Sequence, residues 1–172
     1  MSKPVCIIMV GLPACGKSTL VNKLMGNHSD NAFVYSTDNL IEEWAAEDGK
    51  TYNEVFNDLI GKATSEMNRL LDAAIRNRQD IVWDQTNLGV NKRRKIINRM
   101  RNAGYEVECE CIMPPKGKAQ IAEWQRRLAG RPGKSIPGHI VTSMLETYVI
   151  PAVDEGFEPG GVYFYDMYGN RE

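Results

Sequence analysis

The sequence lacks the features that mark membrane, secreted and zinc-binding proteins. No stretch among its 172 residues approaches the roughly 20 apolar residues of a membrane span. Its four cysteines do not have the spacing of a zinc site. The first residues, 1–4, lead directly into an apolar run and leave no room for a signal peptide. We therefore expect a protein of the reducing cytoplasm with no membrane segment.

The sequence also lacks repeats, low-complexity tracts and the linkers that would separate two domains. A chain of 172 residues can bury a full core as one domain. Apolar residues make up 42% and charged residues 25%, as in ordinary globular proteins. We expect a single domain over residues 1–172.

One segment, residues 11–19, fits the pattern G-x-x-x-x-G-K-[ST] and lies between an apolar run and a helical pattern. The glycines allow backbone N–H groups to turn toward the phosphates of a nucleotide. Lys17 can reach the β- and γ-phosphates, and the Ser18 hydroxyl can ligate Mg²⁺. The sequence thus predicts an ATP and Mg²⁺ site whose nucleotide-binding residues are Gly11, Pro13, Ala14, Cys15, Gly16, Lys17, Ser18 and Thr19.

Strand and helix patterns alternate along the chain. The longest helical pattern covers residues 52–78, with apolar side chains at steps of three and four. This alternation predicts an α/β fold with three layers and a parallel five-stranded sheet. The expected strands are residues 5–10, 32–36, 80–84, 106–113 and 162–166.

Carboxylates follow two of the expected strands, at the edge of the sheet where parallel α/β proteins place their sites. Asp38 follows the second strand, where it could accept the proton of an attacking hydroxyl. Its alternative role is a simple helix N-cap, which Asp favours. Asp84 ends the third strand, where it could hold Mg²⁺ directly or through water.

A basic segment rich in Gly and Pro, at about residues 126–137, joins two helical patterns. In P-loop kinases this place forms a lid whose arginines close over the phosphates. Arg127 and Arg131 are the candidates for nucleotide contacts, and Arg131 also for catalysis together with Lys17. For Arg126 we expect only a solvated position near a helix terminus.

Positive charge is concentrated in residues 89–134, which hold twelve Lys or Arg and four Glu, although the whole chain has a net charge of −1. This asymmetry suggests a phosphate-rich partner on one side of the molecule. The run of residues 92–95, with Arg99 and Arg101, fits a solvated helix face. Alternatively, it could steer a polyanionic acceptor toward the cleft.

Together these motifs resemble the kinase domain of polynucleotide 5′-hydroxyl kinases, both the phage type and the kinase half of animal end-repair enzymes. The resemblance covers nearly the whole chain. Its more specific parts are the D-x-T-N element and the R-x-x-x-R lid. The motifs that carry it, in chain order, are residues 11–19, Thr37-Asp38, Asp84-Gln85-Thr86-Asn87 with an Arg-containing helix, and Arg127-x-x-x-Arg131 before Ile136-Pro137.

The resemblance implies an adenylate-kinase-like sheet and transfer of the ATP γ-phosphate to a nucleic acid, at the 5′-hydroxyl end of a polynucleotide. It also implies that Asp38 is the general base and Arg131 the lid arginine. One position departs from the phage enzymes, in which an arginine three residues after the catalytic Asp grips the acceptor phosphate. Here that position is Ile41. Two other acceptors stay open: hydroxymethyluracil within phage DNA, and a small metabolite or antibiotic.

Overall fold

The computed structural model describes residues 2–27 and 31–172, and its centre is a five-stranded sheet. All pairings are parallel, and the strand order is β2-β3-β1-β4-β5. This confirms the α/β class and the parallel sheet that the sequence predicts. The strands are β1 (Val5–Val10), β2 (Phe33–Tyr35), β3 (Ile81–Trp83), β4 (Glu106–Ile112) and β5 (Val162–Tyr165).

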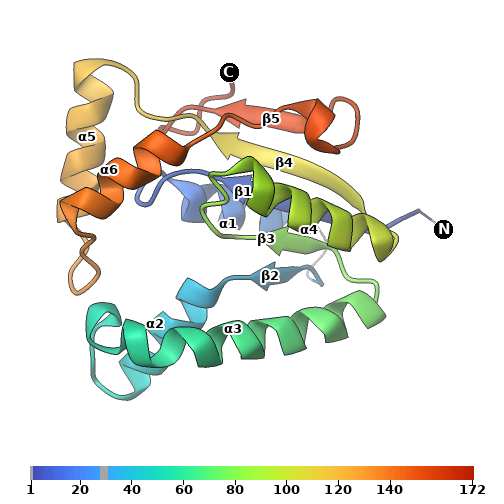
Figure 1. Cartoon of the computed structure of the whole chain (residues 1–172), viewed down its shortest axis with the longest axis horizontal. Coiled ribbons are helices and arrows are strands. Elements are labelled where there is room, and N and C mark those ends of the chain that lie inside the picture. The colour runs from blue at the N-terminus through green and yellow to red at the C-terminus, as the bar shows by residue number, and fades with distance from the viewer. Residues whose placement is uncertain (1, 28–30) are drawn as a thin grey trace.

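Helices cover both faces of this sheet, which gives the expected three layers. In Figure 1, α1 lies behind the sheet and α4 in front of it. Successive residues of β1 point to opposite faces, as in any strand, and both faces are buried. The helices are α1 (Lys17–Asn27), α2 (Thr37–Glu47), α3 (Tyr52–Arg76), α4 (Val90–Asn102), α5 (Gly117–Ala129) and α6 (Gly138–Thr147), with a short 3₁₀ turn, η1 (Val153–Glu155).

Two core clusters correspond to the two faces of the sheet. On one face, Cys6 and Ile8 of β1 pack in a cluster that includes Met67 of α3 and Met100 of α4. On the other face, Ile7 and Met9 of β1 pack in a cluster with residues of α1 and α5. Packing on both faces of the sheet therefore holds the strand ends in fixed positions.

A third, smaller core joins α2 to α3 beside the β2 edge of the sheet (Figure 1). The long helix α3 begins with a capping box, in which Thr51 and Glu54 bond each other's backbone N–H groups. The α2–α3 pair thereby forms a unit at the side of the sheet, and one end of this unit lies beside the carboxyl ends of β2 and β3. The buried residues of this core are Ile41, Ala45, Val55 and Ala63.

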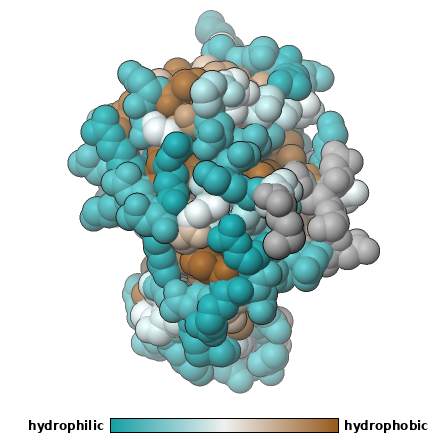
Figure 2. Space-filling model, turned by 90° about the vertical axis from the view of Figure 1, so that its right-hand side faces the viewer, coloured by the Kyte–Doolittle hydropathy of each residue, from teal (hydrophilic) through white to brown (hydrophobic). Residues whose placement is uncertain are grey.

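The loops that follow β1, β2 and β3 lie together at the carboxyl ends of the strands, because these strands are neighbours and parallel. In Figure 1, α5, α6 and the segment between them gather at this same end of the sheet. The end near the N-terminus, seen in Figure 2, is covered mainly by hydrophilic side chains. No helix in the described ranges is long and apolar enough to cross a bilayer.

The basic helix α4 corrects one expectation from the sequence. Arg93 is not part of a solvated face, because it is fully buried and paired with Glu155. Arg99 and Arg101 meet Asp72 and Glu158. Much of the positive charge in residues 89–134 is therefore balanced by carboxylates from elsewhere in the fold, and the net charge of that segment overstates its free basic surface.

Candidate active site

The phosphate-binding loop connects β1 to α1, as the sequence predicts. Lys17 Nζ donates to the carbonyl oxygens of Gly11 and Leu12, at 3.0 and 3.1 Å. A Cβ on Gly11 would lie 2.8 Å from Cys15 Sγ, so a larger residue here would displace the Cys15 side chain. The Cys15 side chain is buried in the core, and it is the backbone of Cys15 that a nucleotide could reach.

Two hydrogen bonds fasten the loop after β3 to its neighbours, one to strand β1 and one to the phosphate loop. Asn87, which is fully buried, donates from Nδ2 to the Met9 carbonyl at 2.8 Å. The Gly11 N–H donates to the Thr86 carbonyl at 3.0 Å. The backbone of Asn87 has a φ of 48°, in the left-handed region that Asn tolerates better than most residues. Asn87 therefore has a structural role in the D-x-T-N element.

Asp38 does not cap α2, because Ser36 does so. The Ser36 hydroxyl accepts from the Asn39 N–H at 3.1 Å, which leaves the Asp38 carboxylate available for other contacts. Its Oδ1 accepts a hydrogen bond from the Tyr52 hydroxyl at 2.7 Å. Asp38 faces the same cleft as Lys17, and this arrangement rules out the alternative of a plain N-cap.

Asp84 lies directly after β3 and lines the cleft with Ser18. Burial raises the pKa of its carboxyl above the usual range, and the Lys17 ammonium opposes this shift. Hydroxyl and carboxylate oxygens are the hard ligands that suit Mg²⁺, which usually takes one or two protein ligands and substrate phosphates. The described residues contain no cluster of three or more metal-binding side chains. Ser18 and Asp84 therefore fit a Mg²⁺ site in which a bound nucleotide would supply the other ligands.

The two lid arginines that the sequence predicts line this cleft, but their surroundings differ. Arg127 bonds to Glu123 and to the Met167 carbonyl, and its guanidinium lies 5.7 Å from the Tyr168 ring centroid. For Arg131, the buried Nη1 has no hydrogen-bond partner among the residues that the structure describes. A buried guanidinium N–H without a partner fits an anion such as a phosphate. Arg126 is exposed and pairs with Glu123, as expected.

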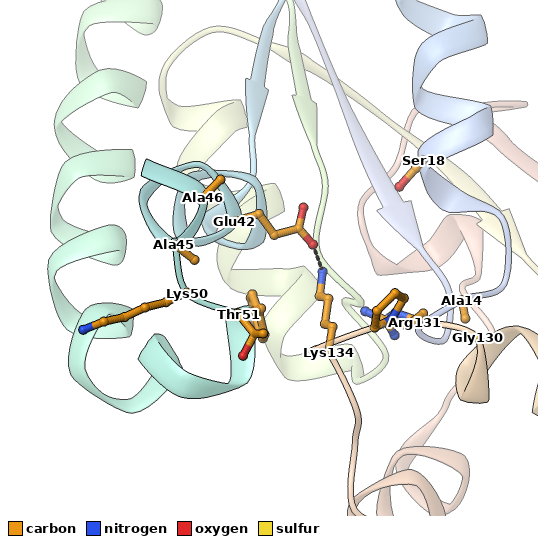
Figure 3. A pocket seen from close by; sticks show the side chains of 12 residues that line it. Ala14, Ser18, Glu42, Ala45, Ala46, Lys50, Thr51, Gly130, Arg131 and Lys134 are labelled. Atoms are coloured by element: carbon orange, nitrogen blue, oxygen red, sulfur yellow. Dashed lines mark hydrogen bonds and ion pairs between the residues drawn. The ribbon is translucent and has the colours of Figure 1, made fainter. Parts of the chain in front are cut away.

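The segment between α5 and α6, residues 130–137, is docked on the start of α3 and is called the lid segment below. The Asn53 N–H donates to the Gly133 carbonyl at 2.9 Å, and Asn53 Nδ2 donates to Ser135 Oγ at 2.8 Å. Lys134 reaches Glu42 of α2, as Figure 3 shows, with Arg131 beside Ala14. These contacts could not be predicted from the sequence, because nothing in the local pattern around residue 134 relates it to α2.

These elements enclose a cleft of about 1240 Å³. One part of its wall is polar and carries the residues that the sequence singled out: Lys17, Ser18, Asp38, Asp84, Arg127 and Arg131. Another part carries apolar side chains from α3, the lid segment and α6, namely Phe56, Ile60, Ile136, Ile140 and Met144. Lys92 also lines the cleft and is the member of the basic run that reaches it. A ligand that combines phosphates with an apolar or planar group fits this lining.

The position that departs from the phage enzymes is not at the cleft surface. Ile41 is fully buried and packs in the core between α2 and α3. The next residue, Glu42, faces the cleft instead. The side chain that α2 presents beside Asp38 is therefore acidic, and the neighbouring cation is Lys134 from the lid segment.

The family of the chain follows from a comparison with family models. The model of the AAA domain family AAA_33 matches residues 6–151. The chain belongs to this AAA domain family. The matched range contains the phosphate loop, Asp38, Asp84 and both lid arginines. Membership in this family, together with the kinase fold, supports a phosphotransferase.

Solved structures share the fold at low sequence identity. The AAA domain protein superposes on a protein from Chloroflexus aurantiacus J-10-fl that is assigned as a kinase, with a TM-score of 0.67, 16% identity and coverage of 96% of this chain and 89% of that one. The PezAT toxin–antitoxin system of Streptococcus pneumoniae gives a TM-score of 0.66, 18% identity and coverage of 100% and 71%. A chain of the Pnkp1/Rnl/Hen1 RNA repair complex gives 0.61 and 17%, with coverage of 86% and 44%. These similarities establish the P-loop kinase fold.

Proposed function

We propose that this AAA domain protein is an ATP-dependent kinase that transfers the γ-phosphoryl group to a hydroxyl of nucleic acid, with the 5′-hydroxyl end of a polynucleotide as acceptor. The observation that carries this proposal is that Asp38 and the phosphate loop line one cleft. Phosphoryl transfer requires a group that receives the acceptor's proton beside groups that neutralise the phosphates. Both requirements are met by residues that lie within this cleft.

The reaction assigns a separate task to each residue. The acceptor hydroxyl loses its proton to an Asp38 oxygen as the hydroxyl oxygen bonds to the γ-phosphorus, while the bond to the β–γ bridging oxygen breaks and ADP leaves. Lys17 and Arg131 neutralise the charge on the phosphoryl oxygens. Ser18 and Asp84 would hold Mg²⁺, which supplies further charge neutralisation when it is bound. The lid segment reduces the access of water to the cleft.

The apolar part of the cleft supports an acceptor with a planar base. Phe56 and Ile60 of α3 face the cleft, as do Ile140 and Met144 of α6. Aromatic and apolar side chains stack on unpaired bases, which suits the end of a strand. Lys92 offers a cation for an acceptor phosphate. The likeness of the fold to a chain of an RNA repair complex agrees with such an acceptor.

The decisive experiment is a transfer assay with γ-labelled ATP on three acceptor classes: 5′-hydroxyl oligonucleotides, duplexes that contain hydroxymethyluracil, and small metabolites. We expect label on the oligonucleotides. About two phosphate contacts on a single strand would raise the KM for the oligonucleotide roughly sevenfold between about 50 and 200 mM salt. Transfer to metabolites alone, without this salt dependence, would show a small-molecule kinase.

The matched variants are Asp38→Asn and Asp58→Asn. Asp58 lies exposed on α3 and outside the cleft. The substitution at Asp38 keeps the size and removes the proton acceptor, so we expect a loss of about 10²–10⁴-fold in turnover. Asp58→Asn should leave the rate unchanged. Equal rates in both variants would exclude Asp38 as the base.

A further inference from the structure

Lys134 lies against both carboxylates that α2 presents to the cleft. Its Nζ is 2.5 Å from Glu42 Oε1 and 3.6 Å from Asp38 Oδ2. The Lys134 side chain is only 19% exposed, compared with 53% for Asp38 and 46% for Glu42. In Figure 3 it extends from the lid segment toward α2, whereas Lys50 points away. The lysine is thus held in place while Asp38 stays open to the cleft.

The other oxygen of Asp38 is held by Tyr52, the first residue of α3. The Tyr52 hydroxyl donates to Oδ1 at 2.7 Å. Burial, together with the hydrogen bond to Asp38, raises the pKa of Tyr52, so its hydroxyl remains a donor throughout the neutral range. Lys134 Nζ also lies 4.6 Å from the Tyr52 ring centroid. Contacts to Oδ1 and Oδ2 from two different elements restrict the rotation of the Asp38 carboxylate.

Lys134 can reach Asp38 because its segment is docked on the start of α3. Gly133 has a φ of +68°, and a Cβ at this position would lie 2.5 Å from Thr51 Cβ. Its carbonyl accepts the Asn53 N–H, a donor in the first turn of α3 that has no partner within the helix. The docking of the segment and the position of the ammonium are therefore coupled.

We propose that Lys134 is a positioning residue for phosphoryl transfer, and that it orients Asp38 when the lid segment docks on α2 and α3. This inference rests on the proposed role of Asp38. The contact of 2.5 Å to Glu42 fixes the ammonium, and the longer distance of 3.6 Å to Asp38 exceeds a hydrogen bond. Lys134 thus orients Oδ2 without forming a hydrogen bond to it, so Oδ2 can accept the proton of the acceptor hydroxyl. Glu42 acts indirectly, by holding Lys134.

The kinetic test compares Lys134→Gln with Lys134→Arg, and with Lys23→Gln as a control. Lys23 is exposed on α1 and does not line the cleft. We expect Lys134→Gln to lower kcat by about 10- to 100-fold, because a misdirected base costs that much, with the KM for ATP changed by less than about twofold. Lys134→Arg keeps the charge and should recover part of the rate. Lys23→Gln should behave as the parent protein.

The second measurement does not depend on catalysis. Hydrogen exchange at the Asn53 amide, without substrates, reports the bond to Gly133. Lys134→Gln should speed this exchange by at least about 10-fold relative to Lys23→Gln. Gly133→Ala, which brings a methyl group against Thr51, should do the same. Gly138→Ala, where a Cβ would meet nothing within 4 Å, should not.

Four results would overturn the inference, and the last of them would overturn the proposed function as well. An unchanged kcat in Lys134→Gln would do so, even with faster Asn53 exchange, because Lys134 would then only fasten the segment. A higher kcat would show that the contact inhibits. Slow exchange at Asn53 in both Lys134→Gln and Gly133→Ala would show that docking does not depend on this contact. If the parent protein transfers no phosphate to any acceptor, the proposed function fails, and the positioning role fails with it whatever Asn53 reports.

Discussion

Arg93 of α4 and Glu155 of η1 form a two-point ion pair in the interior, with side chains 0% and 5% exposed. Nε and Nη2 of the arginine donate to the two carboxylate oxygens at 2.8 and 3.1 Å. The remaining nitrogen, Nη1, donates to the carbonyls of Asn87 and Leu88. The pair therefore supports the loop that carries Asp84 and fastens it to the C-terminal part of the chain.

Removal of one partner of this pair should destabilise the fold strongly. Arg93→Met leaves the buried Glu155 carboxylate without its cation and removes one donor from the carbonyls of Asn87 and Leu88, so we expect a loss of about 3–5 kcal/mol in the free energy of unfolding. Arg94→Gln, at an exposed position of the same helix, should change it by less than about 0.5 kcal/mol. Urea denaturation measures both. A loss at Arg93 no larger than that at Arg94 would contradict a supporting role.

Asn87 should be needed for both its amide and its tolerance of the left-handed backbone. Asn87→Ala leaves the Met9 carbonyl without its side-chain donor and places alanine at a φ of 48°, so we expect a loss of about 2–4 kcal/mol. Asn87→Gly removes the same donor without the backbone strain and should cost less. The difference between the two unfolding free energies measures the strain, and equal losses would show that strain contributes nothing.

Truncation of two arginines in the lid region should affect kcat very differently. Arg131→Ala removes a buried donor that faces the cleft, and we expect kcat to fall by about 10²–10³-fold. Arg126→Ala removes an exposed side chain that pairs with Glu123 and should leave the rate within about twofold. Steady-state kinetics with saturating ATP decide between these outcomes. A large loss at Arg126 would contradict the solvated role that both sequence and structure assign to it.

Stability should fall as the pH rises above about 9. All four cysteines are buried, and burial raises the thiol pKa of each, to about 11 for Cys111. The unfolded thiols ionise first, near the ordinary value of 9.0, so the unfolded state releases protons and becomes favoured. Each buried thiol then costs about 1.4 kcal/mol per pH unit until its folded pKa is reached. Urea titrations at pH 8 and pH 10 test this. Cys111→Ala should reduce the difference.

The sequence predicts the sheet and the phosphate loop well because both depend on local patterns. The run Val5–Val10 is apolar over its whole length, and the spacing of glycine and lysine that follows it indicates a phosphate-binding loop. Asp38 and Asp84 could be placed at the same edge because neighbouring parallel strands end together. The helix α3 follows from the steps of three and four in its apolar residues.

The contacts that the sequence could not predict join residues that are far apart in the chain. Arg93 and Glu155 are separated by 62 positions, and Lys134 and Glu42 by 92. A charged residue has no periodic signal that distinguishes a buried partner from solvent. The run of residues 92–95 therefore resembled a uniform basic face, although Arg93 is in the interior and Lys92 lines the cleft.

The indole N–H of Trp124, near the end of α5, donates to the Pro13 carbonyl of the phosphate loop at 2.7 Å. Trp124 is 4% exposed, which places an intrinsic fluorophore directly against the backbone that a nucleotide would contact. We therefore expect the emission of Trp124, one of the three tryptophans of the chain, to change when a ligand reaches this loop. This signal requires neither a dye nor turnover, and it separates occupancy of the donor site from events at the acceptor side.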